Sequence, residues 1–570
     1  MRPASPFCSA KSLPALAVIP LLVLTCSRLL HNAASIDSLQ PPPLAPSYPF
    51  RTIADSVNRT QTEQRVAAAI RIPTVSKTTG ALSAAAAAAA EANQHAQLRA
   101  FRAFLRAEFP AVFAVVDAEV VGDHSWLLRW KGIDEVGANA KARKPVLICG
   151  HMDVVDVDHV DQWRYPPFAG TVAGGFVHGR GALDMKGMLI SELVAVEALI
   201  KAGYKPKRTF YMAFGHDEET QKTQGSAALS TLFEERGLRF EFVIDEGLVI
   251  ANDMFPGFKT PIALIGVAEK GIAQLTIRAT APGGHASMPF VPSPVYTLAT
   301  ALTRLAKFGP PATLADGPVW DLLRTLAPEH PNPLVRAVLG NRFLAEYLIK
   351  WLPSHIIPGL AAMTRTTLAT TVISGGLGMN ILPTTATASV NCRVRPGETA
   401  DMVLAYVAKA IGAEVVSAAD QNAASAAATE GTGARTTDDT LLSTRLTIAW
   451  NNVCGPRGCD PSAVSSSTSD AYRILAGSIR EVYGKAAALP GAPRNSVHDI
   501  LVAPSLFIGA TDATSYQGVA DAVYRFQPIR LRPADLSLIH GRDERIATKD
   551  LHDMVNFFIV LILNADEGSP

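Results

Sequence analysis

Short apolar runs alternate with amphipathic segments between residues 144 and 244, and this alternation limits the fold more than any other feature of the sequence. The runs have the length of buried strands, whereas the longer segments between them have the spacing of helices. A repeated strand–helix order predicts an α/β fold with a mainly parallel sheet. The predicted elements are strands at 144–149, 208–214 and 240–244, and helices at 186–202 and 225–236.

The pattern changes after about residue 271, where a β-α-β-β-α order begins. Such an order predicts a ferredoxin-like α+β domain inserted into the first domain, although only three of its four strands are visible in the sequence. A helix at 467–483 and a strand at 501–508 then return the chain to the first domain. The elements predicted for the insertion are strands at 274–280, 366–374 and 385–394, and helices at 294–308 and 400–411.

Two domains follow from this order, and the first is discontinuous. It comprises residues 60–271 and 458–570, and residues 272–457 form the inserted domain. Two biased stretches, an alanine run at 81–92 and an Ala/Thr/Gly/Asp-rich stretch at 418–439, lack apolar periodicity. Both are predicted to be surface insertions.

The N-terminus has the features of a targeting segment. It carries Arg2 and Lys11 without an acidic residue, and mostly apolar residues follow at 13–26. This length matches a signal peptide better than a full bilayer span, and an uncleaved signal anchor is the alternative. We therefore expect a signal peptide or anchor at 1–35, a proline-rich linker at 36–59, and entry into the secretory pathway.

Charge and cysteine content exclude several classes of protein. With 52 basic and 51 acidic side chains, the formal net charge of +1 provides no global field that would attract nucleic acid or an anionic membrane surface. Six cysteines in 570 residues are too few for a disulfide-built scaffold. Only Cys454 and Cys459 are close enough along the chain to suggest a local disulfide, whereas Cys149 and Cys392 lie in apolar runs and are predicted to pack in cores.

Acidic residues and histidines follow the predicted strands. Because the carboxyl ends of parallel strands meet at one edge of a sheet, these side chains are expected to lie close together. Carboxylates mixed with imidazoles suit zinc or a similar divalent ion, and one carboxylate can bridge two ions about 3.5–4 Å apart. A two-metal site is therefore predicted from His151, Asp153, Asp184, Glu218, Glu219, Asp245, Glu246 and His540.

Two neighbouring pairs suggest how the roles are divided. In an extended segment, side chains two residues apart face the same way, so Asp153 can orient the imidazole of His151. Adjacent Glu218 and Glu219 point apart, which lets one bind metal while the other acts as a base. Each pair alone is more often a surface or turn feature; their succession at strand ends favours a site.

Six motifs together resemble the co-catalytic zinc aminoacylase and carboxypeptidase family, particularly fungal vacuolar carboxypeptidase S and its secreted N-acyl-amino-acid-hydrolase relatives. The resemblance extends from about residue 60 to 560, and order, spacing and flanking glycines all agree. The motifs are Gly150-His151-Met152-Asp153-Val154-Val155, Gly179-Arg180-Gly181-Ala182-x-Asp184-x-Lys186-Gly187, Gly215-His216-Asp217-Glu218-Glu219, Asp245-Glu246-Gly247, Gly283-Gly284-His285-Ala286-Ser287 and Ile539-His540-Gly541.

The resemblance implies two zinc ions per subunit in the discontinuous domain. Glu218 would be the general base and Asp153 the orienting acid. Asp245 and Glu246 both remain candidates for one ligand position, and Asp245 is preferred because it directly follows the strand. The implied ligands are His151 and Asp245 for one ion, Glu219 and His540 for the other, and Asp184 as the bridge between them.

The resemblance also makes the inserted domain a lid and dimerisation domain. His285 would stabilise an oxyanion, from the neighbouring subunit in a homodimer, although by its local sequence alone it reads as a turn residue. Asn380 and Arg393 match substrate-contacting positions, and a guanidinium can hold a free carboxylate with two hydrogen bonds. One departure is Thr514, which stands where the family commonly has an arginine.

The expected activity is hydrolysis of the amide bond next to a free C-terminal carboxylate in short peptides of the Gly-Xaa type. The alternative is hydrolysis or synthesis of N-acyl amino acids, and a non-catalytic metal-binding scaffold is disfavoured because every ligand and the base are present. The same resemblance implies the vacuole lumen or vacuolar membrane, or secretion. The Asn58-Arg59-Thr60 sequon fits a glycoprotein of that route.

Overall fold

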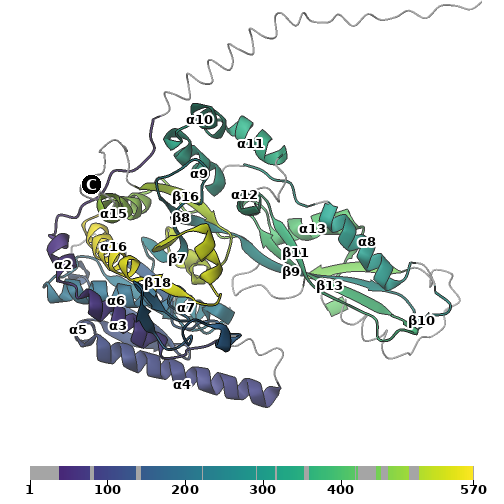
Figure 1. Ribbon diagram of the computed structural model, residues 1–570, viewed down its shortest axis with the longest axis horizontal. Coiled ribbons are helices and arrows are strands. Elements are labelled where there is room, and N and C mark those ends of the chain that lie inside the picture. Colours follow the sequence, from purple (N-terminus) through teal and green to yellow (C-terminus); the bar gives the residue numbers. More distant parts are fainter. Residues whose placement is uncertain are drawn as a thin grey trace, which may run out of the picture.

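The computed structural model describes most of the chain between Asp37 and Gly568 (Figure 1). The predicted targeting segment, most of 418–439, and Cys454 and Cys459 lie outside the described residues. These are 37–76, 83–136, 143–220, 223–289, 292–307, 309–314, 317–351, 358–417, 419–420, 444–450, 460–486 and 500–568.

An eight-stranded sheet forms the larger part of the molecule, in the order β1-β2-β6-β3-β7-β17-β8-β16. The central strands from β6 to β17 run parallel, as does the edge pair β8 and β16, whereas β1 and β2 form an antiparallel edge. This confirms the predicted mainly parallel sheet. The strands are Asp117–Val121 (β1), Ser125–Trp130 (β2), Val146–His151 (β3), Phe210–Gly215 (β6), Phe242–Ala251 (β7), Ile262–Glu269 (β8), Leu501–Phe507 (β16) and Val523–Leu531 (β17).

Strand β3 shows why its sequence is a continuous apolar run. Val146 and Ile148 point into one core, whereas Leu147 and Cys149 point into a second core on the other face of the sheet. Both faces of a parallel sheet are covered, so successive side chains are all buried. The buried Cys149 thiol is free, which fits its predicted packing role.

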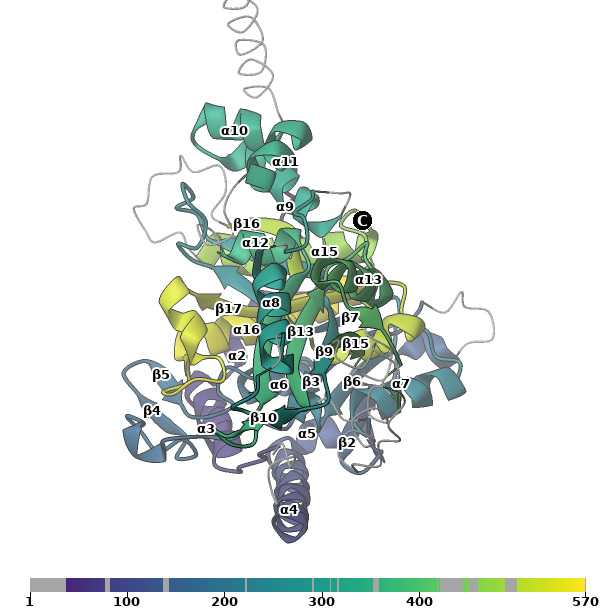
Figure 2. The ribbon, with the colours of Figure 1, turned by 90° about the vertical axis from the view of Figure 1, so that its right-hand side faces the viewer.

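Helices cover both faces of the eight-stranded sheet (Figure 2). Helices α3, α6, α15 and α16 share one core, while α7 and the 3-10 segment η7 (Asp512–Val519) share the other. The helices of this part are Phe50–Ser56 (α2), Arg59–Ile70 (α3), Ala84–Glu108 (α4), Pro110–Phe113 (α5), Lys186–Lys201 (α6), Ser226–Glu235 (α7), Asp470–Ala486 (α15) and Thr548–Glu567 (α16). A small sheet of Thr171–Ala173 (β4), Phe176–His178 (β5) and Arg545–Ala547 (β18) lies beside them.

A second sheet of five strands extends away from the first (Figure 1). Its order is β11-β13-β9-β15-β14, and helices α8 and α13 pack on its buried face. Strand β15 is the fourth strand that the sequence did not reveal. The elements are Gly271–Thr280 (β9), Pro294–Lys307 (α8), Thr367–Gly375 (β11), Thr385–Val394 (β13), Ala400–Ile411 (α13), Glu414–Val415 (β14) and Arg445–Trp450 (β15), with a hairpin-like pair of Gly284–His285 (β10) and Ile381–Leu382 (β12) at the tip.

Four further helices interrupt the inserted sequence, and two of them, α9 and α11, pack on the edge strand β16 of the first sheet. Leu322 and Leu326 share a core with Leu501 and Ala503 of the edge strand β16. The helices are Pro318–Leu326 (α9), Pro333–Leu339 (α10), Arg342–Trp351 (α11) and Pro358–Thr364 (α12).

The alanine run at 81–92 is predicted to be a surface insertion, and its described residues lie at the surface in a regular helix. Residues 84–92 form the exposed first part of the 25-residue helix α4, which begins where the Ser83 hydroxyl accepts a hydrogen bond from the Ala86 N–H. Alanine has the highest helix propensity, so an apolar stripe is not needed in the exposed half. The second half buries Leu98, Phe101 and Leu105 and fixes the helix to the protein. Among the described residues, none of the helices is long and apolar enough to cross a membrane.

Candidate active site

The candidate site lies at the carboxyl edge of the three central parallel strands. His151 is the last residue of β3, Glu218 and Glu219 follow β6 within a 3-10 turn, and Glu246 lies in β7. Asp184 lies two residues before the start of α6, and His540 follows the 3-10 turn η8 (Pro533–Leu538). Residues separated by almost 400 positions therefore meet at one edge.

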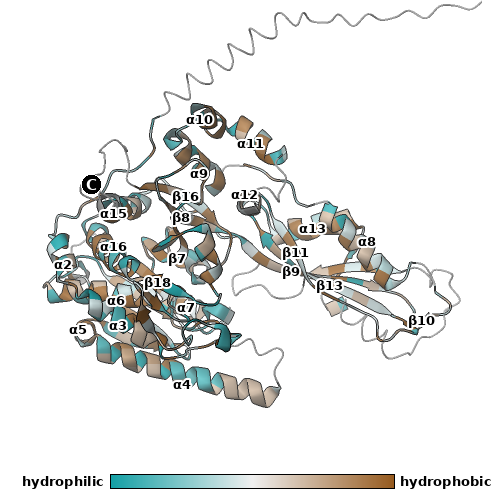
Figure 3. Ribbon diagram, viewed as in Figure 1, coloured by the Kyte–Doolittle hydropathy of each residue, from teal (hydrophilic) through white to brown (hydrophobic). Residues whose placement is uncertain are grey.

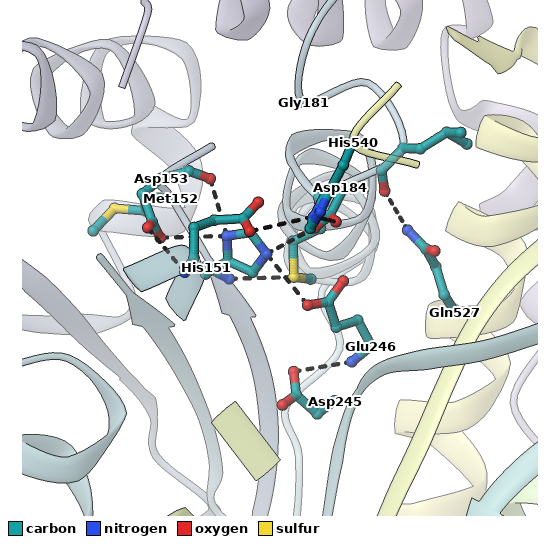
Figure 4. Close-up of polar contacts among 12 residues, drawn as sticks. His151, Met152, Asp153, Gly181, Asp184, Asp245, Glu246, Gln527 and His540 are labelled. Carbon is teal, nitrogen blue, oxygen red and sulfur yellow. Dashed lines mark hydrogen bonds and ion pairs between the residues drawn. The ribbon is translucent and has the colours of Figure 1, made fainter. Parts of the chain in front are cut away.

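Asp184 lies between the two histidines (Figure 4). Its Oδ1 is 2.9 Å from His151 Nε2, and its Oδ2 is 2.9 Å from His540 Nε2. The two oxygens of one carboxylate thus face two different imidazoles, which is the arrangement expected of a bridging ligand. The backbone of His540 has a left-handed φ of 57°, a conformation that non-glycine residues adopt rarely and often at functional sites.

Glu246, rather than Asp245, lies beside His151. Its Oε1 is 3.2 Å from His151 Nε2, whereas Asp245 Oδ1 accepts a hydrogen bond from the Glu246 N–H and is directed away (Figure 4). The sequence analysis preferred Asp245 as the metal ligand, whereas the geometry favours Glu246. Neighbouring residues of a strand face opposite ways, so only one of the two side chains can face the cleft. Gly247 has a φ of 134°, and a Cβ there would lie 2.8 Å from Arg525 Cβ, so the close approach of these strands requires glycine.

Asp153 lies behind His151, on the side away from Asp184. The His151 Nδ1 is 3.4 Å from Asp153 Oδ1 and 3.0 Å from the Asp153 carbonyl oxygen. The other oxygen, Asp153 Oδ2, accepts hydrogen bonds from the Ser76 hydroxyl at 2.6 Å and from the Glu219 N–H at 3.3 Å. Asp153 therefore fixes both the imidazole ring and the turn that carries Glu219.

Glu218 and Glu219 lie beside the two histidines. Glu219 Oε2 is 3.3 Å from His540 Nε2, and a ligand atom of Glu218 lies within 4.8 Å of one on His151 and one on Glu219. Burial raises the pKa of Glu218 well above its usual range, although the nearby His151 opposes this. A carboxyl group placed in the cleft in this way can act as a general base or acid toward a bound molecule.

A buried glutamate that the sequence analysis missed holds the Asp184 loop in place. Glu544 is fully buried; its Oε1 accepts hydrogen bonds from the backbone N–H groups of Leu183 and Asp184, at 2.7 and 3.1 Å. Its Oε2 accepts from the Gly181 N–H at 3.0 Å and from Arg180 at 2.6 Å. Its position four residues after His540, within an otherwise polar stretch, was the only signal in the sequence. Glu544 thus connects the loop of Asp184 with the loop of His540.

A cleft of about 320 Å³ opens onto these side chains. Glu218, Glu219, Glu246 and His540 line it on one side, and Arg393, at the end of β13, lines it from the inserted domain. Among the described residues, no hydrogen bond or ion pair holds the Arg393 guanidinium, so it is available to an anionic group in the cleft. Burial lowers the pKa of Arg393, although Glu269 nearby opposes this.

Thr511 and Gln527 are cleft residues that sequence reasoning did not identify. The Thr511 N–H donates to Glu269 Oε2 at 2.9 Å, and the Thr514 hydroxyl donates to Glu269 Oε1 at 2.5 Å. Glu269 also forms a buried ion pair with Arg525. Thr514 occupies the position where the family commonly has an arginine. Its hydroxyl therefore hydrogen-bonds to a buried glutamate of the protein itself.

His285 and Asn380 are not brought to this cleft. They lie together at the tip of the five-stranded sheet, where the Ala286 N–H donates to the Asn380 carbonyl oxygen at 3.0 Å and both residues are exposed. The His285 Nδ1 is 2.7 Å from the Ser287 hydroxyl. Figure 1 shows β10, which ends at His285, at the end of the molecule remote from β7.

The residues present fit two divalent cations. Three groups of side chains bring one ligand atom each to within 4.8 Å of the others: His151 with Asp184 and Glu246, His151 with Glu218 and Glu219, and Asp184 with Glu219 and His540. Glu219 Oε1 is buried without a hydrogen-bond partner among the described residues. Burial raises the pKa of Glu246 to about 8, so without a cation this carboxyl favours the protonated state. Cations would satisfy these oxygens.

Comparison with known proteins agrees with this geometry. The family model described as "Peptidase family M20/M25/M40" matches residues 147–564. The sequence is 31% identical over 469 residues to the probable carboxypeptidase S-like 2 of Dictyostelium discoideum, covering 82% of this chain and 79% of that one. It is also 31% identical over 510 residues to the N-fatty-acyl-amino acid synthase/hydrolase PM20D1 of Xenopus tropicalis, with 89% and 86% covered. Carboxypeptidase S of Saccharomyces cerevisiae is 28% identical over 554 residues, with 92% and 88% covered.

A solved structure shows the same fold. The M20 family metallo-carboxypeptidase Sso-CP2 of Sulfolobus solfataricus superposes with a TM-score of 0.57 at 18% identity, covering 89% of this chain and 99% of that one. The chain belongs to the M20/M25/M40 peptidase family. It is a carboxypeptidase S-like metallopeptidase, a hydrolase that acts on peptide bonds, and the resemblance found in the motifs is confirmed.

Proposed function

We propose that this metallopeptidase removes the C-terminal residue from short peptides of the Gly-Xaa type, with two zinc ions per subunit. The observation that carries the proposal is the placement of Asp184 between His151 and His540, with Glu218 lining the same cleft. His151 and Glu246 would hold one ion, Glu219 and His540 the other, and Asp184 would bridge them. When bound, the ions supply Lewis acidity that polarises a carbonyl and makes a water molecule more acidic.

Glu218 is the proton carrier in this proposal. Its carboxyl lies in the cleft, where it can accept a proton from the attacking water and return it to the leaving amine. Asp153 keeps the His151 ring in one orientation through its contact with Nδ1, so that Nε2 faces the cleft. Glu544 has the corresponding role for Asp184 through two backbone hydrogen bonds.

Arg393 would bind the free carboxylate of the substrate. It enters the cleft from the inserted domain, opposite the acidic edge, and is available for a bidentate contact. A carboxylate at Arg393 would place the preceding amide between the guanidinium and the carboxylates. This spacing is the reason for preferring cleavage next to a C-terminus.

N-acyl-amino-acid hydrolysis or synthesis is the second candidate, favoured by the similarity to PM20D1 proteins. An N-acyl amino acid also presents a free carboxylate next to an amide, so Arg393 and Glu218 would serve both substrates. Leucine release from glycyl-leucine, compared with release from N-oleoyl-leucine, separates the two. We expect faster release from glycyl-leucine; turnover of the acyl compound alone would replace the peptidase proposal.

A homodimer would complete the site. His285 and Asn380 are exposed at the tip, and along β11 most side chains are exposed, including Val372 and Ile373. An unpaired strand edge with exposed apolar residues suits pairing with a second copy. In such a dimer His285 would donate a hydrogen bond to an oxyanion in the partner's cleft.

We also propose passage through the secretory pathway to the vacuole or the exterior. Asn58 is exposed, and its side chain accepts the N-terminal hydrogen bond of α3 from Gln61 N–H at 3.0 Å. Its amide nitrogen is thus turned outward for a glycan. Digestion with a glycosidase followed by mass measurement of the secreted or vacuolar protein tests this proposal; an unmodified Asn58 would contradict it.

A further inference from the structure

An exposed apolar surface lies on helices α10 and α11, remote from the candidate active site and from the tip of the inserted domain. Phe343, Tyr347 and Trp351 of α11 are 85%, 67% and 73% exposed. They recur at every fourth residue, so they share one face of the helix. Leu344 and Leu348 of α11 and Leu334 of α10 extend the same surface. We call these six residues the α10–α11 patch.

The helices are fixed to the protein by small contacts on their other side. Only Ala345 and Ile349 of α11 are buried, together with Ala337 of α10. Figure 3 shows the brown, apolar segments of α10 and α11 at the periphery of the molecule. Contiguous exposed aromatic surface of this kind marks an interaction site in a protein that is otherwise well packed.

The described chain begins beside this patch. The Ser38 hydroxyl donates to the carboxylate of Glu329, four residues before α10, and Gln40 Oε1 accepts a hydrogen bond from the Val502 N–H at 2.7 Å. Eleven residues separate Ser38 from Cys26, the end of the apolar sequence at 13–26. An extended chain of that length spans at most about 40 Å. An apolar segment inserted in a bilayer would therefore hold this face of the protein close to the membrane.

The chemistry of the patch suits the surface of a bilayer. Tyrosine and tryptophan favour the boundary between headgroups and acyl chains, because each has an apolar ring and a polar atom. Residues 333–351 contain three basic residues, Arg336, Arg342 and Lys350, against one acidic residue, Glu346. Lys350 is paired with Glu346, so a small net positive charge remains beside the apolar side chains, and this charge is compatible with phospholipid headgroups.

We infer that the α10–α11 patch docks on a phospholipid bilayer and orients the peptidase on it. The two other occupants that the structure suggests are a second copy of the chain and the chain's own residues 13–26. The inference does not depend on the proposed substrate, because the patch contains no residue of the cleft.

Lipid photolabelling of the full-length protein tests the inference. Vesicles of phosphatidylcholine and phosphatidylserine containing a photoactivatable phosphatidylcholine are mixed with the protein and irradiated, and labelled peptides are mapped by mass spectrometry. We expect label on residues 342–351. The variant F343S/Y347S/W351S should lose this label at least about tenfold, because interfacial binding scales with the buried apolar area.

A matched control removes three exposed apolar side chains elsewhere. Val115, Val120 and Ile133 are 52%, 51% and 56% exposed, and β1, which carries Val120, is at the opposite edge of the sheet from β16. The variant V115S/V120S/I133S should keep the label on α11. Circular dichroism and thermal unfolding show whether each variant is folded. If the patch variant is not folded, the wild-type label on 342–351 relative to that on 117–130 decides.

Three results would overturn the inference. One is the absence of label on 342–351 while vesicles bind the protein through other residues. Another is protection of α11 from hydrogen exchange without vesicles that increases with protein concentration, which would assign the patch to a second copy. The last is protection of α11 from hydrogen exchange, without vesicles, that does not depend on protein concentration. If this protection is lost when leucines in 13–26 are replaced by serine, the patch binds that segment.

Discussion

At the edge of the eight-stranded sheet, His151 and His540 both already lie within hydrogen-bonding distance of Asp184, supported by buried acids behind them. At the tip of the five-stranded sheet, His285 and Asn380 are exposed to solvent and do not line the cleft. Both regions carry motifs of the same family. The difference teaches that one chain can preassemble the groups proposed to bind metal and transfer protons, whereas the groups proposed to contact the substrate from the tip would need a second chain or a large movement.

Among changes at the edge of the eight-stranded sheet, replacement of Glu218 by glutamine should have the largest effect on kcat. Loss of the proton carrier should lower kcat for glycyl-leucine by about 10²–10⁴-fold while both metal ions remain bound. The exposed Glu235 of α7 provides a matched control, since Glu235→Gln should leave kcat unchanged. Full activity of the Glu218 variant would remove this residue from the mechanism.

Replacement of His285 tests the proposed role of the tip of the five-stranded sheet. His285→Ala should lower kcat by about 10²–10³-fold, the usual cost of one oxyanion donor. Co-expression of this variant with Glu218→Ala should then restore roughly a quarter of the wild-type activity. Half of the dimers would be mixed, and each mixed dimer would have one intact site. Purified mixed dimers without activity would show that His285 does not act across subunits.

A comparison of Glu246→Gln with Asp245→Asn tests which of these two residues binds metal beside His151. Since Glu246 faces His151 and Asp245 does not, the first variant should lose one metal ion. The second should keep both ions with an affinity at most about 10–100-fold lower, as for residues that support a ligand. Metal titration by calorimetry measures the difference, and the opposite order would restore Asp245 as the ligand.

Acid should destabilise the eight-stranded part through His124. Burial lowers the pKa of His124 to about 4, with the positive charges of His95 and Arg102 adding to the effect. The unfolded state therefore binds the proton first, so the free energy of unfolding should fall as pH decreases from about 6.5 to about 4. The expected loss is on the order of 1–3 kcal/mol. Chemical denaturation at several pH values should show a smaller loss for His124→Gln; an unchanged pH dependence would exclude this residue.

Much of the eight-stranded sheet and of the candidate site could be predicted from the sequence, because acidic residues or histidines follow the apolar strands. The apolar runs before His151 and Glu218 are long enough to specify buried parallel strands, and the acids after them mark the edge. β8 was missed because it is followed directly by β9 with no helix signal between them, and β17 because Arg525, Gln527, Pro528 and Arg530 interrupt its apolar residues. β15 was missed because it follows a long biased stretch. The choice between Asp245 and Glu246 depends on which of two neighbouring side chains faces the cleft, and only the strand register decides that.

The contribution of Glu544 was also beyond the sequence. Its carboxylate contacts backbone N–H groups about 360 positions earlier, and no residue type marks such a contact in advance. The separation of His285 from the cleft was not visible for the same reason. Motifs indicate which side chains belong to a site but not which chain supplies them.

Metal content measured on the purified full-length protein tests the central claim most directly. Inductively coupled plasma mass spectrometry of the wild type should find two zinc ions per chain, and Asp184→Asn, which changes the bridging carboxylate, should lose at least one of them with most of the activity. A fully active wild-type protein with one metal ion or none per chain would contradict the account.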